Sequence, residues 1–271
     1  MTLADPLAVY RPDILTGHVA IVTGGATGIG RGIARSFARL GADLCIASRR
    51  PDVIARAAEE LSAETGRAVL GLVADVRNPD DAQRIVDATV AKFGKLDTLV
   101  NNAAGNFLAP AAALSPNGFR TVIDIDLCGT FNMCRAAFAA LGQAGDALIL
   151  NISATLHYHG TPLQLHASAA KAGIDALTKN LAVEWGSSGV RVNAIAPGPI
   201  GDTEGMRRLA PGDLATRAKV GIPLGRFGAV DEIAAAAVFL RSAAAAYMTG
   251  AIMVVDGGQC VSLPMMGTLM P

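Results

Sequence analysis

Short, almost wholly apolar runs alternate along this chain with longer amphipathic stretches. The apolar runs fall at 18–23, 43–48, 68–74, 96–102, 146–152, 190–196 and 252–256, and the amphipathic stretches, such as the one from Pro51 to about Glu64, lie between them. Strands that are apolar on both faces are typical of a parallel sheet covered by helices on each side. The pattern therefore predicts one doubly wound α/β domain over residues 1–271.

Three segments depart from this alternation. Residues 1–15 are expected to form an extended N-terminal arm, and residues 262–271, rich in Met and Pro, a C-terminal tail. Residues 199–221 are rich in Gly, Thr, Pro and Arg and directly follow a predicted strand. Open α/β sheets bind ligands at such strand ends, so this segment is predicted to be a substrate lid.

Composition excludes several classes of partner. Lysine plus arginine and aspartate plus glutamate each number 23, so no net field favours a nucleic acid or an anionic membrane. No apolar run reaches membrane-spanning length, because Arg241 interrupts the most hydrophobic late segment. The four cysteines form no Cys-x-x-Cys pair and the N-terminus lacks a signal-peptide pattern, which predicts reduced thiols in the cytoplasm.

A glycine-rich loop follows the first predicted strand and opens the first helix. The run Thr-Gly-Gly-Ala-Thr-Gly-Ile-Gly at 23–30 places Gly24, Thr27, Gly28, Ile29 and Gly30 at this turn. Glycines let the backbone approach a pyrophosphate, whose charge then meets free amides at the helix N-terminus. The loop is predicted to hold a dinucleotide; the alternative is a tight turn that only packs helix on strand.

The residues after the second strand bear on which dinucleotide is bound. A carboxylate there would accept the ribose hydroxyls of NAD, but the chain has Ser48, Arg49 and Arg50. Cationic donors suit the 2′-phosphate of NADP(H), which an acidic residue would repel. The predicted cofactor is therefore NADP(H), and the alternative is a pair of solvated arginines at a helix start.

Two further strand ends are candidates for contact with the cofactor. Asp75 and Val76 end the third strand, where Asp75 is placed to cap the adenine edge, and Asn102 and Ala103 end the fourth strand beside the ribose. Either pair alone is also compatible with ordinary polar chemistry at strand ends.

Together these motifs, with Lys171 and the run Val-Asn-Ala-Ile-Ala-Pro-Gly-Pro-Ile at 192–200, resemble the short-chain dehydrogenase/reductase family over nearly the whole chain. The resemblance implies a Rossmann fold, a homotetramer and an active site of Asn, Ser, Tyr and Lys. It also implies cofactor contacts at Pro197, Gly198, Ile200 and Thr203, and at Lys171.

The chain departs from that active site at three of its four positions. Asp126 stands where the Asn is expected, Ala154 where the Ser is expected and Ala167 where the Tyr is expected. Alanine neither donates a proton nor hydrogen-bonds an alkoxide, so reduction of a simple carbonyl by a phenol acid is not expected.

A narrower resemblance accounts for these departures. The stretches at 103–108, 122–132, 166–171, 181–186 and 196–209 are similar to dienoyl-CoA reductases of the peroxisomal type, a branch that lacks the Tyr and uses an Asp with the Lys. These roles fall on Asp126 and Lys171. The resemblance implies acyl-CoA contacts at Arg77, Phe107, Ser115, Pro116, Asn117 and Arg208, with Arg207 as a neighbouring candidate; the alternative for each arginine is a solvated surface side chain.

The hypothesis is therefore NADPH-dependent reduction of 2,4-dienoyl-CoA to 3-enoyl-CoA in unsaturated fatty acid degradation. If Asp126 lies within about 6 Å of Lys171, the ammonium favours the carboxylate form and a water held by Asp126 supplies the proton. Burial could instead keep the carboxyl neutral, which the sequence does not decide. The alternatives are a short-chain reductase acting on a ketone or enone, and a silent NADP(H)-binding scaffold.

Two remaining features concern metals and location. His157, His159 and His166, with Tyr158 and Gln164 among them, lack a zinc spacing, so a substrate-loop or interface role is expected and no metal. The chain ends Leu-Met-Pro rather than in the small-basic-leucine address of peroxisomal members, which predicts a cytoplasmic protein.

Overall fold

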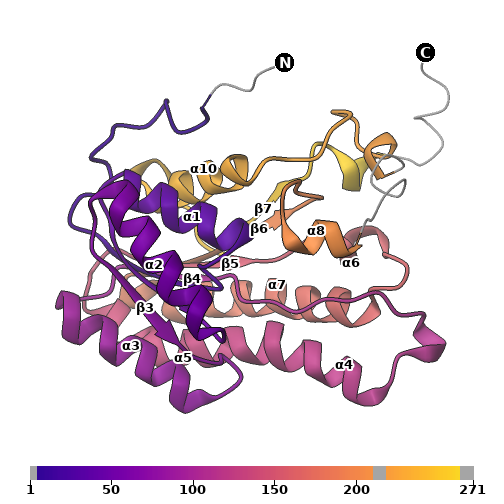
Figure 1. Cartoon of the computed structure of the whole chain (residues 1–271), viewed down its shortest axis with the longest axis horizontal. Helices are drawn as coiled ribbons and strands as arrows, with labels where there is room; N and C mark the ends of the chain where they lie inside the picture. Colours follow the sequence, from indigo (N-terminus) through magenta and orange to yellow (C-terminus); the bar gives the residue numbers. More distant parts are fainter. Residues whose placement is uncertain (1–4, 210–217, 263–271) are drawn as a thin grey trace.

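The computed structural model describes residues 5–209 and 218–262, with side chains described except at 207–209. Its centre is a seven-stranded parallel sheet in the order β3-β2-β1-β4-β5-β6-β7 (Figure 1). The strands are β1 (Val19–Thr23), β2 (Asp43–Ser48), β3 (Val69–Val73), β4 (Thr98–Asn101), β5 (Ala147–Ile152), β6 (Val190–Pro197) and β7 (Ile252–Val255). Every predicted strand is present with bounds within two residues, so the predicted Rossmann fold is confirmed.

Helices cover both faces of the sheet (Figure 1). One layer contains α1 (Gly28–Arg39), α2 (Pro51–Thr65) and α10 (Val230–Arg241), and the other contains α3 (Pro79–Phe93), α4 (Pro116–Ile123), α5 (Gly129–Gly142) and α7 (Leu165–Trp185). Shorter elements are η1 (Ala111–Ala113), η2 (Asp124–Cys128), α6 (Leu156–His159), η3 (Gly186–Ser188), α8 (Glu204–Leu209), η4 (Ala243–Ala245) and η5 (Gln259–Val261). Each layer buries its own apolar cluster against the sheet, which is why the strands are apolar on both faces.

Strand order reverses at the centre of the sheet. β1 pairs with β2 on one side and with β4 on the other, and both pairings are parallel. Loops at the carboxyl ends of these strands therefore diverge, which leaves a crevice where doubly wound proteins bind ligands. The glycine loop, the 101–105 segment and the loop after β6 all leave the sheet at this edge.

The predicted arm and lid differ in how far the structure describes them. From residue 5 to residue 17 the chain forms successive turns rather than an extended arm, because Leu7 and Leu15 bury their side chains and the Tyr10 hydroxyl donates to the Ala235 carbonyl. Of the predicted lid, residues 210–217 lie outside the described part, as do residues 263–271 of the predicted tail. Lid and tail therefore stay predictions.

Within the described ranges, no helix combines the length and the apolar character needed to cross a bilayer.

Candidate active site

The glycine loop is packed against the end of β4. The Thr23 hydroxyl accepts hydrogen bonds from the backbone N–H groups of Asn102 and Ala103, both at 3.0 Å. A Cβ atom on Gly24 or Gly30 would lie only 2.8 or 2.3 Å from Asn102 Nδ2. Larger residues at these two positions would push the loop away from β4, so the glycines are required for this close approach.

The N-terminus of α1 has the chemistry that a pyrophosphate needs. Thr27, the exposed residue before α1, makes no side-chain cap, and the first turn of the helix contains no acidic residue. Gly28, in the left-handed region at φ +54°, turns the chain so that the first amides of α1 follow directly. Uncapped amides and the helix dipole favour a bound anion, so Gly28, Ile29 and Gly30 fit a dinucleotide phosphate.

The end of β2 presents cations at the same edge of the sheet. Arg49 and Arg50 are exposed, and Arg50 lies 3.9 Å from Glu204 on α8. The Ser48 hydroxyl is buried and has no hydrogen-bond partner among the described atoms. A buried hydroxyl without a partner next to two arginines suits a phosphate-bearing ribose, because a bound oxygen would satisfy the hydroxyl.

Asp75 and Arg77 form an ion pair that was not predicted from the sequence. Arg77 Nε donates to both carboxylate oxygens of Asp75 at 3.0 Å, and its hydrogen bonds hold the pKa of Asp75 below its usual value. The structure thus joins a residue assigned to the cofactor with one assigned to the substrate. Val76 is buried beside them, and Asn132 Nδ2 donates to its carbonyl at 3.0 Å.

The loop after β6 faces the glycine loop. A Cβ atom on Gly28 would lie 3.8 Å from Thr203 Cγ2, while Gly198 packs so closely on Asp256 that a Cβ would lie 2.6 Å from its side chain. Pro197 ends β6 and Ile200 is buried in the core. The cofactor candidates Pro197, Gly198, Ile200 and Thr203 therefore lie on one loop that borders the predicted pyrophosphate site.

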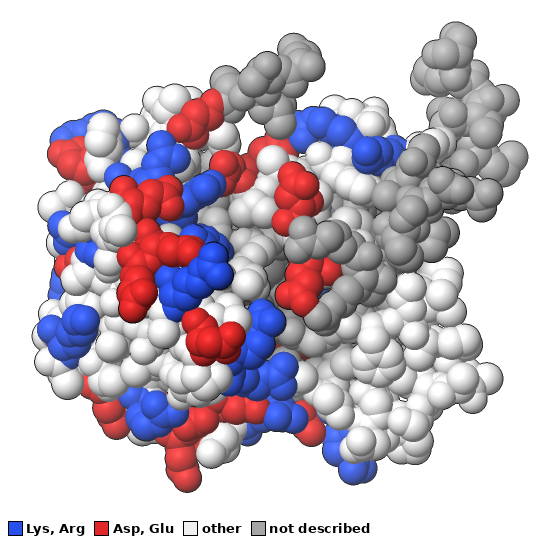
Figure 2. Space-filling model, viewed as in Figure 1, with Lys and Arg blue, Asp and Glu red and all other residues white. Residues whose placement is uncertain are grey.

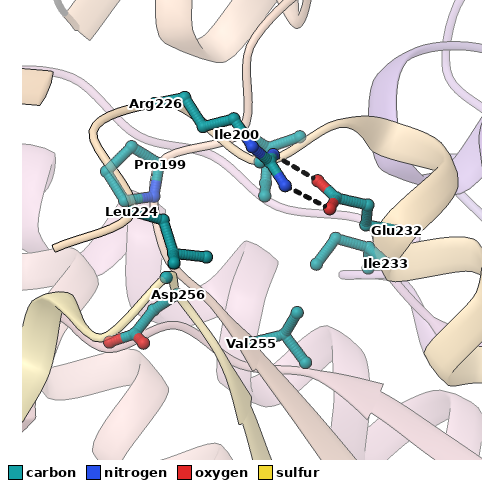
Figure 3. A pocket seen from close by; sticks show the side chains of 10 residues that line it. Pro199, Ile200, Leu224, Arg226, Glu232, Ile233, Val255 and Asp256 are labelled. Atoms are coloured by element: carbon teal, nitrogen blue, oxygen red, sulfur yellow. Dashed lines mark hydrogen bonds and ion pairs between the residues drawn. The ribbon is translucent and has the colours of Figure 1, made fainter. Parts of the chain in front are cut away.

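A pocket opens beneath this loop (Figure 3). Pro199, Ile200, Leu224, Arg226, Gly228, Glu232, Ile233, Val255, Asp256 and Gly257 line it. Arg226 donates from both terminal nitrogens to Glu232, at 2.8 and 2.7 Å, which lowers the pKa of Glu232. Neither Asp126 nor Lys171 lines this pocket, so it borders the cofactor loop and does not contain the candidate catalytic pair.

Asp126 and Lys171 form a buried ion pair at the carboxyl end of the sheet. Lys171 Nζ lies 3.1 Å from Asp126 Oδ2, and the side chains are 10% and 1% exposed. Asp126 Oδ1 accepts the backbone N–H of Gly105 at 2.7 Å, and Lys171 Nζ donates to the Ile152 carbonyl at 3.0 Å. Both charges are therefore held by hydrogen bonds as well as by each other.

Local backbone features bring this pair together. Asp126 lies in η2, a π-type turn between α4 and α5, and the Thr130 hydroxyl donates to the Asp126 carbonyl at 2.6 Å. Gly173 lies two residues after Lys171 on α7, and a Cβ atom there would be only 2.7 Å from the Leu127 side chain. The absence of a side chain at Gly173 therefore allows α7 to approach η2 closely. Such wide turns inside helices are frequent at functional sites.

No tyrosine takes the place of the missing phenol. Ala167, at the expected position, is 2% exposed. All three tyrosines of the chain are described: Tyr10 binds the Ala235 carbonyl, Tyr158 binds Asp175, and Tyr247 is fully exposed. None of these three described tyrosine hydroxyls hydrogen-bonds Asp126 or Lys171.

Several residues assigned to the substrate lie together. Phe107, 41% exposed, has its ring edge-on to the buried His166 with centroids 4.3 Å apart, and a Cβ on Gly118 would lie 3.2 Å from Phe107 Cζ. Ser115, Pro116 and Asn117 are exposed at the start of α4, where the Ser115 hydroxyl caps the helix through Gly118 N. Arg207 and Arg208 belong to α8, and their side chains lie outside the described residues.

Surface charge differs across the face seen in Figure 2. Blue and red side chains alternate over the part of the molecule that contains α1, α2 and α3, whereas the part near the far end of α4 is largely white. On this face the charged side chains are therefore concentrated on the side of α1, α2 and α3.

The histidines do not form a metal site in the described residues, which contain no group of three or more His, Cys, Asp or Glu side chains placed to hold a metal ion. His157 hydrogen-bonds Asp175, His159 is exposed, and His166 is buried against Phe107.

A doubly wound sheet, a glycine loop at its first crossover and a buried Asp–Lys pair at its strand ends define an oxidoreductase of the Rossmann type. Residues 24–259 match the family model described as enoyl-(acyl carrier protein) reductase. The chain belongs to the short-chain dehydrogenase/reductase family.

Individual relatives agree with this assignment. The chain is 49% identical to a peroxisomal 2,4-dienoyl-CoA reductase of Arabidopsis thaliana, over 94% of this chain and 88% of that protein. It is 49% identical to the peroxisomal 2,4-dienoyl-CoA reductase of Danio rerio, over 92% and 84% of the two chains. Its structure resembles a short chain dehydrogenase from Bacillus anthracis, with TM-score 0.81, 42% identity and coverage of 90% and 97%.

Proposed function

We propose that the protein reduces 2,4-dienoyl-CoA to 3-enoyl-CoA with NADPH. The observation that carries this proposal is the buried pair of Asp126 and Lys171, 3.1 Å apart, beside an alanine where a carbonyl reductase would have its tyrosine. The names of the Arabidopsis and Danio relatives give this reaction with a (3E)-enoyl-CoA product, which supports the same assignment here.

Lys171 has one ammonium hydrogen left for a ligand. An ammonium group has three donors, and two are directed at Asp126 and the Ile152 carbonyl. The remaining donor would hold a ribose hydroxyl of the nicotinamide nucleotide. A bound NADPH supplies the hydride, and the Lys171 charge lowers the free energy of the enolate that develops on the thioester.

Asp126 is held as an acceptor and not as an acid. Its Oδ1 faces an N–H donor and its Oδ2 faces an ammonium, so both contacts require lone pairs on the carboxylate. The second lone pair on either oxygen would bind a water molecule. We propose that this water donates the proton to carbon and that Asp126 orients it.

The product depends on which carbon receives that proton. Addition of hydride at the far end of the diene leaves an extended enolate, whose negative charge is shared by the thioester oxygen, the α-carbon and the γ-carbon. Protonation at the α-carbon leaves the remaining double bond between C3 and C4, as in 3-enoyl-CoA. The water on Asp126 is therefore proposed to face the α-carbon.

NADPH is proposed over NADH because of the charge at the end of β2. Arg49 and Arg50 are exposed there beside the unpartnered Ser48 hydroxyl. Replacement of both arginines by Ala is expected to raise the KM for NADPH about 10- to 100-fold, the loss of one or two charge-assisted hydrogen bonds, and to change the KM for NADH little. Equal effects on both cofactors in steady-state assays would contradict this role.

The acyl-CoA site is proposed to include Arg77, Phe107, Ser115, Pro116, Asn117 and Arg208. For Arg77 this role requires exchange of Asp75 for a ligand phosphate, because the two side chains are paired here. A homotetramer, the lid over 199–221 and a cytoplasmic location also stay predictions, and the two relatives above are named as peroxisomal.

The direct test follows NADPH oxidation by absorbance with a 2,4-dienoyl-CoA as substrate and identifies the product by mass spectrometry and NMR. We expect turnover with the CoA thioester and none with a simple ketone or a free enone. NADPH binding without turnover of any of these substrates would identify a silent scaffold. Faster turnover of the ketone or enone would identify another short-chain reductase.

A further inference from the structure

A second buried carboxylate, Asp175, lies one helical turn beyond Lys171 on α7. Its side chain is 9% exposed. Oδ1 accepts from the Ser153 hydroxyl at 2.6 Å, and Oδ2 accepts from His157 Nε2 and from the Tyr158 hydroxyl, both at 2.9 Å. This Asp175 cluster thus joins the end of β5, helix α6 and helix α7.

Every partner of Asp175 in the cluster is a donor. The His157 proton is assigned to Nε2 because that nitrogen faces a carboxylate oxygen. Burial, and then the hydrogen bond to Asp175, raise the pKa of Tyr158, so its phenol stays protonated and continues to donate. A carboxylate with three such donors is well satisfied, and its removal would leave the buried Ser153 hydroxyl and the partly buried His157 without this acceptor.

Helix α6 begins a segment, residues 155–164, that continues from the Asp175 cluster to the substrate residues. The Leu163 carbonyl accepts the N–H of Ala109 at 2.9 Å, and Gln164 Oε1 accepts from Asn106 Nδ2 at 2.6 Å. The segment is therefore fixed to α7 near its start and to residues 105–109 at its end.

Residues 105–109 contact both halves of the proposed active site. The Gly105 N–H binds Asp126 Oδ1, and Phe107 is the exposed aromatic residue assigned to the acyl-CoA. A movement of the 155–164 segment would thus reach Phe107 and Asp126 through two hydrogen bonds. Thr155, at the start of the segment, donates its N–H to the Pro197 carbonyl at 3.4 Å, whereas residues 156–164 make no hydrogen bond to the glycine loop or to residues 197–203 among the described residues.

We propose that Asp175 is a positioning residue for the acyl-CoA half of the site. It holds α6 through His157 and Tyr158, and the end of the same 155–164 segment, at Leu163 and Gln164, contacts residues 105–109, against which the substrate is proposed to bind. The inference rests on the proposed function, because it takes a CoA thioester as the ligand of that segment. Asp175 contacts neither reacting group, so it acts through the loop and not in the chemical step.

The test replaces Asp175 by Asn, which keeps the shape but turns one oxygen into an NH₂ group that faces donors. We expect the KM for 2,4-dienoyl-CoA to rise about tenfold, since a hydrogen bond to a charged group is lost, while the Kd of NADPH measured by fluorescence stays within about twofold. Backbone amides of 155–164 should exchange hydrogen faster in the free enzyme.

The matched control is Glu184→Gln, which removes the same charge from an exposed position on the same helix, and all its constants should equal those of the wild type. Tyr158→Phe removes one donor only and should raise the KM for the dienoyl-CoA about threefold. It also keeps the proposal testable if Asp175→Asn does not fold. In Asp175→Asn the further change Tyr158→Phe should have little additional effect.

Three results would overturn the proposal: unchanged exchange over 155–164, an unchanged KM for the dienoyl-CoA, or equal weakening of dienoyl-CoA and NADPH. The last would show a general structural role. Failure of the proposed function is separate, because wild-type enzyme would then not reduce the dienoyl-CoA at all. The hydrogen-exchange comparison needs no substrate and still shows whether Asp175 fixes the segment.

Discussion

Two buried carboxylates lie near Lys171, Asp126 in contact with its ammonium group and Asp175 one turn further along α7, and they have different partners. Asp126 is paired with an ammonium group and one backbone N–H, and each oxygen keeps a lone pair for a ligand. Asp175 accepts hydrogen bonds from the side chains of Ser153, His157 and Tyr158. The first arrangement leaves two lone pairs of the carboxylate for a ligand, whereas in the second the protein occupies three of about four.

This difference indicates that the two aspartates have different functions. A charged pair with unused donors and acceptors is able to respond when charge develops on a bound substrate. A carboxylate whose lone pairs are mostly occupied by protein donors fixes the elements from which those donors come. The exposed fraction of the side chain, 1% for Asp126 and 9% for Asp175, does not distinguish the two residues, whereas their hydrogen-bond partners do.

Asp126→Ala is expected to produce the largest effect. The substitution removes the acceptor that orients the proposed proton-donating water, and general acid–base catalysis typically contributes 10²–10⁴-fold. We therefore expect kcat to fall by about that factor while NADPH binding changes little. Single-turnover rates measured by stopped flow with NADPH and a dienoyl-CoA decide the point, and a wild-type rate in the variant would remove Asp126 from the mechanism.

Lys171→Met should reduce turnover by about 10²–10³-fold, because the ammonium charge that stabilises the developing enolate is lost, and removal of one preorganised electrostatic group at a developing oxyanion typically costs this much. Methionine keeps the length of the side chain but leaves Asp126 with the Gly105 N–H as its remaining partner. NADPH should bind more weakly as well, because the proposed ribose contact is lost. A full rate with NADPH and an unchanged Kd would show that the ammonium is structural.

The fold was predictable because its pattern is periodic. Strands buried on both faces are apolar throughout, as in Ala147–Ile152, and Pro or Gly marks the ends of helices such as α2 and α3. The turns over residues 5–17 were not predicted, because Leu7 and Leu15 are isolated apolar residues whose burial depends on tertiary packing.

The candidate site was predictable only in part. The glycine loop has a local spacing from which a dinucleotide-binding role is predicted, while Asp126 and Lys171 were paired by family resemblance and lie 45 residues apart in sequence. A backbone partner such as the Gly105 N–H cannot be recognised from the sequence, because nearly every residue type has a backbone N–H group. The Asp175 cluster was missed because its members are 17 to 22 residues from Asp175 and follow no common period.

Ser153→Ala is expected to affect stability more than catalysis. The Ser153 hydroxyl donates to Asp175 Oδ1 at 2.6 Å inside the core, and loss of a hydrogen bond to a charged group costs about 1.5–3 kcal/mol. The free energy of unfolding in urea should fall by about that amount, with kcat within about threefold of the wild type. A kcat loss as large as that of Asp126→Ala would place Ser153 in the chemical step and erase the distinction between the two carboxylates.

The smallest expected effect concerns the ionisation of Tyr158. Burial is the main cause of its raised pKa and the hydrogen bond to Asp175 the second, so the neutral phenol is the form that the fold stabilises. This stabilisation is complete below the usual tyrosine value of 10.0 and is lost as the pH rises through the higher folded value. The difference in phenolate absorbance between the wild type and Tyr158→Phe isolates this one titration. The midpoint of this titration should lie above pH 10 in the wild type. In Asp175→Asn it should move down but stay above 10, since burial of the phenol persists. Ionisation at or below pH 10 in the wild type would show that the phenol does not face a carboxylate.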